Sequence, residues 1–592
     1  FHVAALTNQE TSMSDKRNGL TRRQVLASTG AAVASLGVVS LGASKARAEG
    51  NWHHQADVVV IGAGAGGCAA AITAHDAGDS VVLLEKAAFV GGTAFKSAGV
   101  LWIPNNFSLK ANGVDDNRAD CLAYLARYSY PGRYNPELPN LGLEADEIAL
   151  LEAFYDNASV AVDSLRKSGS LNLAEWRGFA LDKPAVDYLD QVPENKVPTG
   201  RPLGPLTANG AMGQGAELMT QLGEAVKKRG IKTLLEHRAM RLVQDDHGRV
   251  VGLEAGAGET TVTIQGRKGV IFTTGGYAHN PELKRRYQRA PLFGACAMPA
   301  SEGDFITIAG AAGAQMGDLG SAWRSQVVLE ECLVSPLLGA GVFFPPGDSM
   351  VQVNRYGHRA LNEHRNYNDR TEAHGIYKES TAEFPNQIMF MIYDQRSAET
   401  FAGAYPFPAT PMGASYVLSG ATLKELAGNI SARLREIEAD TGGASLDAGF
   451  PTNLSNTIER FNGFAVSGKD DDFQRGSSGY DTYWHEVFSP MAADSGNAAN
   501  TNPNVTMHPF REQGPYYCIM LVAGALDTSG GPSVNHKAEV LDTHGQPIAG
   551  LYGAGNCVAS PSREAYYGAG HTLALAVTFG FIAANNVHRH TG

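Results

Sequence analysis

The sequence predicts an α/β fold: a Rossmann-like domain into which a second domain of α+β type is inserted. A strand–helix–strand unit with a glycine-rich turn lies near the start of the chain. Two further apolar strands, at 270–276 and 547–556, also run into glycine turns. Between those turns the stretch 283–500 is richer in Pro, Asn, aromatic and charged residues and shows few βαβ signals, which indicates an inserted domain.

The first segment is not expected to belong to the fold. The arginine pair Arg22-Arg23 is followed by a mildly apolar stretch at 27–42 and by Ala-Arg-Ala at 46–48. A basic region, a short apolar region and a small-residue cleavage site are typical of a secretory signal. The arginine pair resembles a twin-arginine signal. We therefore predict an N-terminal extension and signal over 1–48 and a periplasmic or otherwise exported protein; the alternative is an ordinary disordered N-terminus.

Length and composition narrow the class of protein. A chain of 592 residues is long enough for two or three domains, and 43% hydrophobic with 18% charged residues is ordinary for a globular enzyme. The net charge of −12 argues against a nucleic-acid partner. The six cysteines lie far apart without a C-x-x-C pair, so we expect no metal site. No apolar run beyond the signal reaches membrane-spanning length, so the mature chain is expected to have no transmembrane segment.

The strand–helix–strand unit predicts nucleotide binding. The apolar run 56–61 leads into a turn with Gly62, Gly64 and Gly67, and the second strand ends at Glu85. The first two glycines allow a tight turn and close approach of a pyrophosphate, and the third lets the helix pack on the strand. The helix N-terminus faces the phosphates, and the terminal carboxylate can accept hydrogen bonds from both ribose hydroxyls.

The spread of glycine turns favours FAD over NAD. Gly91-Gly92-Thr93 and Ser97-Ala-Gly99 follow the first unit closely, and a strand near the C-terminus ends in Gly555-Asn556. Such a second dinucleotide-associated strand closes around the ribityl chain and ring of FAD in two-dinucleotide-binding flavoproteins. The alternative is that these are ordinary βα turns. No histidine lies in 93–99, so FAD is expected to be non-covalent. The expected cofactor-binding residues are Gly62, Gly64, Gly67, Glu85, Lys86, Gly91, Gly92, Thr93, Ser97, Gly99, Gly275, Gly555, Asn556, Thr572 and Leu573.

The domain limits follow from these segments. We predict an FAD-binding domain formed by 52–282 and 508–592, with a substrate or cap domain at 283–507. Within the latter, 467–504 is dense in Gly, Asp, Ser and Asn, which indicates loop or lid.

A tyrosine stands in a second glycine-rich loop near the C-terminus. In Glu564-Ala-Tyr566-Tyr567-Gly568-Ala-Gly570, a phenol O–H and a bare backbone N–H can converge on one point. Two such donors can bind a carbonyl oxygen, especially one that becomes an enolate.

At this point the chain resembles the fumarate reductase/succinate dehydrogenase flavoprotein superfamily, and within it the 3-ketosteroid Δ1-dehydrogenases. The resemblance covers most of the mature chain. It is strongest at 91–106, 515–556 and 568–580. It implies a dehydrogenase that introduces a double bond next to the ketone of a ketosteroid or other cyclic ketone. A quinone or cytochrome would then be the separate electron acceptor.

The resemblance also implies the catalytic residues. The Tyr-Pro-Gly-Pro-Gly motif of those dehydrogenases falls on 566–570 with both prolines lost, so Tyr566 and Gly570 would be the ketone clamp. Their Asn-Glu-x-x-x-Tyr motif makes Tyr367 the base, and an Asp-Tyr pair makes Tyr188 its helper. Tyr367 would take the α-proton while the β-hydrogen leaves as hydride to flavin N5. Its pKa, near 10 in water, would have to fall, and a hydrogen bond from Tyr188 could lower it. Each tyrosine could instead be a packing residue.

Two alternatives stay open. A periplasmic reductase of the fumarate or urocanate kind would share the FAD domain, but Tyr567 stands roughly where its substrate arginine would fall, and Asp527 replaces its histidine. A non-catalytic flavin electron shuttle would not need the tyrosines.

Arg563 departs from the family pattern, and it could bind a substrate anion or pair with Glu564.

Overall fold

The computed structural model describes residues 52–178 and 183–590. The predicted signal at 1–48 lies outside these residues and stays a prediction. An eight-stranded sheet contains both strands of the predicted strand–helix–strand unit, and its main strand order is β16-β17-β9-β1-β2-β6. Strands β17, β9, β1, β2 and β6 are parallel neighbours in that order, and β7 and β8 extend the sheet from β9. The strands are β1 His54–Ile61, β2 Val81–Leu84, β6 Lys232–Leu234, β7 His237–Gln244, β8 Val250–Ala257, β9 Thr260–Phe272, β16 Glu539–Leu541 and β17 Pro547–Gly553.

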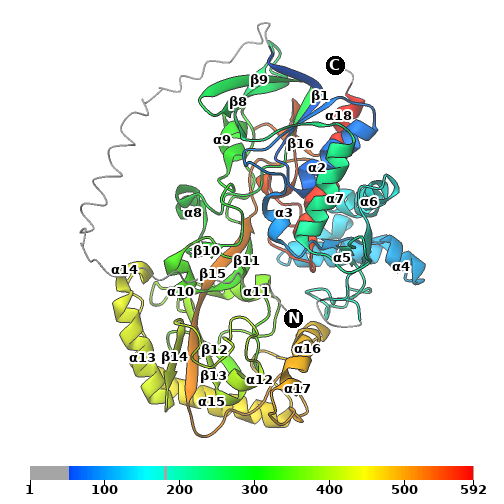
Figure 1. Ribbon diagram of the computed structural model, residues 1–592. Coiled ribbons are helices and arrows are strands. Elements are labelled where there is room, and N and C mark those ends of the chain that lie inside the picture. The colour runs from blue at the N-terminus through cyan, green and yellow to red at the C-terminus, as the bar shows by residue number, and fades with distance from the viewer. Residues whose placement is uncertain (1–51, 179–182, 591–592) are drawn as a thin grey trace. The chain divides into compact units, whose positions relative to one another are not determined.

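Helices α2 (Ala65–Asp76) and α18 (His571–Arg589) pack closely beside this sheet (Figure 1). Glycines permit this approach. A Cβ at Gly580 would lie 2.5 Å from the Gly66 carbonyl oxygen, and one at Gly66 would lie 2.8 Å from the carbonyl oxygen of Ala576. The other helices of this part are α3 Gly92–Lys96, α4 Phe107–Ala111, α5 Arg118–Ser129, η1 Pro139–Gly142, α6 Ala145–Lys167, α7 Gly215–Lys228, α8 Pro281–Tyr287, α9 Asp304–Ala311 and η3 Gly555–Cys557. Strands β3 Leu101–Trp102, β4 Leu173–Glu175 and β5 Pro202–Pro205 form a small antiparallel sheet.

A second, six-stranded sheet is built around the long strand β15 (Tyr516–Thr528). Its other strands are β10 Gly294–Ala295, β11 Ala322–Val328, β12 Met350–Val353, β13 Ile388–Asp394 and β14 Val417–Gly420. Strand β15 falls within 508–592, the stretch assigned from the sequence to the FAD-binding domain, yet it pairs with β10, β11, β13 and β14. The domain limits themselves stay predictions.

Helices α13 (Leu423–Glu436) and α15 (Phe450–Ser467) flank the second sheet (Figure 1). Their apolar faces pack into one core with strand residues such as Phe390 and Met520. The remaining elements are α10 Leu329–Val334, α11 Tyr367–Glu372, η2 Ala373–Gly375, α12 Gln395–Thr400, α14 Glu438–Thr441, α16 Gly479–Val487 and α17 Ser489–Asp494. The expectation of loop over 467–504 is therefore wrong in part, because α16 and α17 lie there. Helix α16 buries Tyr480, Tyr483 and Trp484, so packing stabilises a helix that composition alone does not predict.

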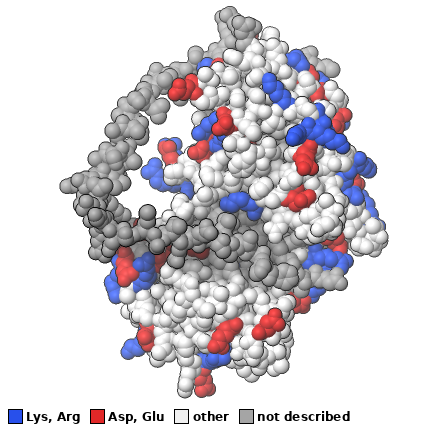
Figure 2. All heavy atoms as spheres, in the orientation of Figure 1, with Lys and Arg blue, Asp and Glu red and all other residues white. Residues whose placement is uncertain are grey.

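Within 52–178 and 183–590, no helix is long and apolar enough to span a membrane. The same residues hold no cluster of His, Cys, Asp or Glu suited to a metal ion. On the face drawn in Figure 2, Lys and Arg side chains lie among Asp and Glu side chains and do not gather in one patch.

Three histidines whose pKa is lowered make acid lability an expected property. Burial lowers the pKa of His374 and of His485 to about 4, and that of His571 to about 3. The unfolded chain binds protons on these rings below about pH 6.5, whereas the folded protein does not. Their contribution to the free energy of unfolding is therefore fully present above about pH 6.5 and falls as the pH is lowered towards 3. We expect His374→Gln to weaken this dependence in urea unfolding between pH 7 and pH 4. Parallel curves for parent and variant would contradict the assignment.

Candidate active site

The three strands that end in glycine turns lie side by side. Strands β17, β9 and β1 are adjacent and parallel, so Gly553, Phe272 and Ile61 bring their turns to one edge of the sheet. This is the edge at which open α/β sheets bind ligands. The sequence predicted the three turns separately, and their meeting at one edge is a property of the strand order.

The structure explains why glycine stands at each of the three positions of the first turn. Gly62 has φ 96°, which favours glycine. A Cβ at Gly67 would lie 1.8 Å from the Gly62 carbonyl oxygen, so only glycine lets helix and strand pack this closely. A Cβ at Gly64 would meet only the Gly91 carbonyl oxygen, at 3.9 Å. Gly64 precedes α2 and provides no side-chain cap, which leaves the first turn of the helix available to a pyrophosphate.

Glu85 and Lys86, both predicted to bind the cofactor, have different surroundings. The Glu85 carboxylate is buried and accepts hydrogen bonds from the Ala63 N–H at 2.9 Å and the Ala87 N–H at 2.8 Å. This fixes its orientation at the end of β2. The Lys86 ammonium lies 3.0 Å from both Glu302 and Asp304. The structure therefore gives no support for the Lys86 side chain as a cofactor ligand.

The segment after β2 is shaped by backbone that favours glycine. Gly91 has φ 147°, Gly92 φ 53° and Gly99 φ 72°. The Gly91 N–H donates to the Ala63 carbonyl oxygen at 2.9 Å, which holds this loop against the first turn. The Ser97 hydroxyl accepts the Gly99 N–H at 3.0 Å, and the Thr93 hydroxyl accepts the Met298 N–H at 3.0 Å.

The remaining predicted cofactor residues lie on the other two turns and at the start of α18. The Asn556 side chain donates to Asp527 at 3.3 Å and accepts the Trp323 indole N–H at 2.8 Å. Gly276, next to the positive-φ residue Gly275, donates its N–H to Asp527 at 2.9 Å. Gly275, Gly555, Asn556, Thr572 and Leu573 are each partly exposed.

Replacement of Gly64 tests whether this turn holds the cofactor. We expect Gly64→Ala to retain the unfolding temperature of the parent apoprotein, because the added methyl meets protein only at 3.9 Å. The flavin content should fall, since the methyl takes the space that the pyrophosphate needs. Gly428→Ala on α13, where a Cβ meets nothing within 4 Å, is the matched control. Unchanged flavin absorbance in Gly64→Ala would place the pyrophosphate elsewhere.

The three tyrosines predicted to be catalytic come together from distant segments. Tyr188, Tyr367 and Tyr566 are 1%, 6% and 3% exposed. The Tyr188 hydroxyl donates to the Tyr367 oxygen at 2.9 Å. The Tyr566 ring lies 5.2 Å from the Tyr188 ring and 5.4 Å from that of Tyr367, between centroids. Tyr367 opens α11, which is capped by Asn366, and Tyr566 lies in the loop before α18.

Burial dominates the ionisation of these phenols. It raises the pKa of Tyr367 well above its ordinary value, and the hydrogen bond from Tyr188 acts in the opposite direction. Burial likewise raises the pKa of Tyr566, whereas hydrogen bonds with Tyr367 and Thr572 lower it. The expected fall in the pKa of Tyr367 is thus not found among the described residues, although Tyr188 contributes in the expected direction.

Gly570 offers a backbone donor beside this cluster. It has φ 89°, and a Cβ there would lie 2.3 Å from the Val100 carbonyl group. Its own carbonyl oxygen accepts the Trp102 N–H at 3.2 Å. Among the described residues, its N–H has no hydrogen-bond acceptor. The N-terminus of the 19-residue α18 adds a partial positive charge at the same place.

Part of the aromatic enclosure around the three tyrosines has little signal in the sequence. Tyr480 on α16 is fully buried, and its ring centroid lies 5.2 Å from that of Tyr188. Phe343 lies 5.1 Å from Tyr367, and Phe344 stacks on Trp484 at 3.5 Å. The signal that the sequence offers is the i, i+4 spacing of Tyr480 and Trp484, in a stretch whose composition indicates loop.

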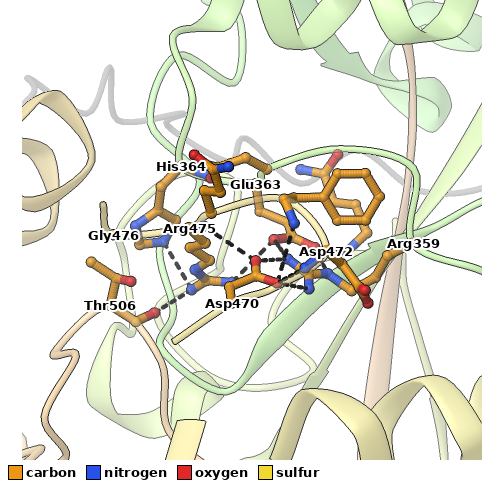
Figure 3. Close-up of polar contacts among 12 residues, drawn as sticks. Arg359, Glu363, His364, Asp470, Asp472, Arg475, Gly476 and Thr506 are labelled. Atoms are coloured by element: carbon orange, nitrogen blue, oxygen red, sulfur yellow. Dashed lines mark hydrogen bonds and ion pairs between the residues drawn. The ribbon is translucent and has the colours of Figure 1, made fainter. Parts of the chain in front are cut away.

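A buried ionic network holds the segment that precedes Tyr367 (Figure 3). Arg359 lies 2.8 Å from Glu363 and 2.9 Å from Asp470, and Arg475 lies 3.4 Å from Glu363. The four side chains are 4% exposed or less, and they carry two charges of each sign. The network links residues 359–364 to residues 470–475, which precede α16. It thereby holds the chain segment that leads into Tyr367.

Arg563 does not pair with Glu564. No ion pair joins them among the described residues, and the Arg563 guanidinium instead lies 5.5 Å above the Tyr130 ring. Arg563 is exposed and has φ 54°. Of the two interpretations of Arg563 given above, the pair with Glu564 is therefore wrong.

The parallel sheet, its glycine turns and the enclosed phenols define a dinucleotide-binding flavoprotein oxidoreductase. Residues 57–573 match the FAD binding domain family (FAD_binding_2), so the chain belongs to that family and its cofactor is FAD. The 4-oxocyclohexanecarboxylate 2-dehydrogenase of Sinomonas cyclohexanicum is 32% identical, with 90% of this chain and 92% of the relative covered. The 3-oxosteroid 1-dehydrogenase of Mycobacterium tuberculosis strain H37Rv is 30% identical, with 90% and 99% covered.

The fold is shared with a solved structure. The 3-ketosteroid delta1-dehydrogenase from Sterolibacterium denitrificans, solved in complex with 1,4-androstadiene-3,17-dione, superposes with a TM-score of 0.73. It is 24% identical and covers 90% of this chain and 99% of its own. The α/β fold predicted from the sequence, a two-dinucleotide-binding FAD domain with an inserted α+β domain, is confirmed.

Proposed function

We propose that the protein is an FAD-dependent dehydrogenase that introduces an α,β double bond next to the ketone of a cyclic substrate. The observation that carries the proposal is the convergence of Tyr188, Tyr367 and Tyr566 in one buried cluster near Gly570. The two relatives named above act, by their names, on a cyclic oxo acid and on 3-oxosteroids. FAD, when bound, supplies the acceptor for the hydride that leaves the β-carbon.

In this proposal the protein acts on the proton and on the carbonyl oxygen. Tyr566 and Gly570 donate to the ketone oxygen and stabilise the negative charge that develops there. Tyr367, as phenolate, takes the α-proton, and the hydrogen bond from Tyr188 stabilises that phenolate. The α-carbon keeps the electron pair, the β-carbon loses hydride, and the C=C bond forms between them. Burial excludes water, which strengthens both interactions.

The direct test is anaerobic bleaching of the flavin absorbance by a panel of saturated ketones. We expect cyclohexanones or 3-ketosteroids to bleach the enzyme and to be recovered as enones. The rival function is reduction of an activated alkene. Chemically reduced enzyme that is reoxidised by fumarate-like acids, without ketone bleaching, would favour that rival. The position expected for its arginine holds Tyr567, whose hydroxyl lies 2.6 Å from that of Ser129.

The electron acceptor and the location of the protein are also proposals. We propose a separate quinone or cytochrome as acceptor and export through the twin-arginine pathway. The arginine pair Arg22-Arg23 before an apolar stretch supports export.

The charge of the substrate is tested through Arg563. Since its guanidinium is exposed and unpaired with Glu564, we expect Arg563→Ala to lower kcat/KM for carboxylated cyclic ketones about tenfold or more. Neutral ketones, which offer no charge to pair, serve as the control and should change little. Equal, small effects on charged and neutral ketones would mean that Arg563 binds no substrate anion.

A further inference from the structure

The loop that carries Tyr566 and Gly570 also holds an imidazole with no assigned role. His571 is the first residue of α18 and is 0% exposed. Its Nε2 shares a hydrogen bond of 2.8 Å with the Ser562 hydroxyl. Its Nδ1 is buried and has no hydrogen-bond partner among the described residues. An unsatisfied buried nitrogen costs free energy. The stability of the fold therefore does not by itself account for a histidine at this position.

The imidazole lies inside the loop. Its ring centroid is 4.2 Å from that of Tyr567, 5.9 Å from that of Tyr566 and 5.7 Å from that of Trp323. The same Trp323 ring lies 5.6 Å from Tyr566, edge to face. A displacement of the imidazole would therefore be felt directly at Tyr566.

Ser562 ties down the start of the same loop. Its hydroxyl donates to the Ala565 carbonyl oxygen at 3.1 Å, and its carbonyl oxygen accepts the Ala565 N–H at 3.0 Å. At the other end, the His571 N–H donates to the Gly568 carbonyl oxygen at 3.1 Å. The contact between Ser562 and His571 thus joins the two ends of a loop whose interior residues are the proposed clamp.

We propose that His571 and Ser562 are a positioning pair that holds the 562–571 loop, so that the Tyr566 O–H and the Gly570 N–H meet at one carbonyl oxygen. The inference rests on the proposed function for its catalytic consequence and on the hydrogen-bond geometry for the loop itself. Burial lowers the pKa of His571 to about 3, so the imidazole is neutral and adds no charge beside the clamp. It touches neither substrate nor reacting atoms in this scheme.

Three variants separate the hydrogen bond from mere packing. His571→Leu fills the space without a hydrogen bond, Ser562→Ala removes the same bond from its other end, and the His571→Gln side chain can place an amide near Nε2. We expect the first two to lower kcat roughly ten- to a hundredfold with little change in KM, because a misplaced clamp fails mainly in the transition state. His571→Gln should retain most of the activity. His588→Gln, at the far end of α18, is the control and should match the parent.

Amide hydrogen exchange gives a readout that needs no turnover. In the flavin-loaded enzyme, peptides that cover 562–571 should exchange faster in His571→Leu and in Ser562→Ala than in the parent, and α2 should be unaffected. Unchanged exchange in Ser562→Ala would overturn the inference, as would a His571→Gln variant as slow as His571→Leu. If the parent desaturates no ketone, the proposed function fails, and the exchange rates still decide whether the pair holds the loop.

Discussion

Tyr367→Phe is expected to abolish ketone desaturation while the enzyme keeps its flavin. The variant removes the oxygen that lies 2.9 Å from the Tyr188 hydroxyl and, with it, the proposed base. General-base catalysis typically contributes about 10²–10⁴ in rate, and we expect a loss in that range. Exchange of the substrate α-hydrogen with deuterated solvent should be lost as well, because this exchange needs the base but not hydride transfer.

The pH dependence follows from the burial of Tyr367. Since burial raises its pKa, the phenolate proposed as the base becomes more abundant as the pH rises above neutrality. We therefore expect kcat/KM of the parent to increase on the alkaline side of neutrality.

Tyr393→Phe is the matched control for both readouts. Tyr393 lies on β13, is 0% exposed, and its hydroxyl has no hydrogen-bond partner among the described residues. It should lose no activity. A Tyr367→Phe enzyme within a few-fold of the parent would show that this tyrosine only packs.

Tyr566→Phe should lower the rate of desaturation by about 10²–10³, the usual effect of removing one donor from an oxyanion site. The loss should appear in kcat as well as in kcat/KM, because the negative charge on the ketone oxygen develops in the transition state. Flavin content and the absorbance spectrum of the oxidised enzyme should be retained.

The adjacent Tyr567→Phe provides an internal comparison. Tyr567 is equally buried, but its hydroxyl lies 2.6 Å from that of Ser129 and serves the packing of α5. We expect this variant to lose stability, by about 1 kcal/mol, and to keep its rate. If the two variants lost activity to the same extent, a clamp role for Tyr566 would be refuted.

The strands around the cofactor could be predicted because their signals are local. An apolar run that ends in a glycine turn identifies β1, β9 and β17. The roles of Gly62, Gly64 and Gly67 follow from the few residues from the end of β1 to the first turn of α2. Helix α16 could not be predicted in this way. The surrounding stretch is dense in Gly, Asp, Ser and Asn, and the helix is stabilised by burying Tyr480, Tyr483 and Trp484, with Phe344 of a distant loop stacked on Trp484.

The site was only partly accessible from sequence. The three tyrosines came from the resemblance to a family, and no periodicity links Tyr188 with Tyr367, which are 179 positions apart. Lys86 is among the predicted cofactor-binding residues, and no local signal predicts that its ammonium contacts Glu302 and Asp304, which are more than 200 residues away. Adjacency in the sequence also suggests a pair between Arg563 and Glu564, but the Arg563 guanidinium lies over the Tyr130 ring.

The distribution of the phenols over the chain has a consequence for recombination between homologous enzymes. Tyr367 belongs to α11 beside the second sheet, whereas Tyr566 and Gly570 belong to the loop before α18. A chimaera that exchanged only residues 283–507 would thus combine the proposed base of one parent with the proposed carbonyl-binding groups of the other. The activity of such a hybrid should depend on how well Tyr367 of one parent is placed relative to Tyr566 and Gly570 of the other. Only parents in which these residues have the same relative positions should give active hybrids.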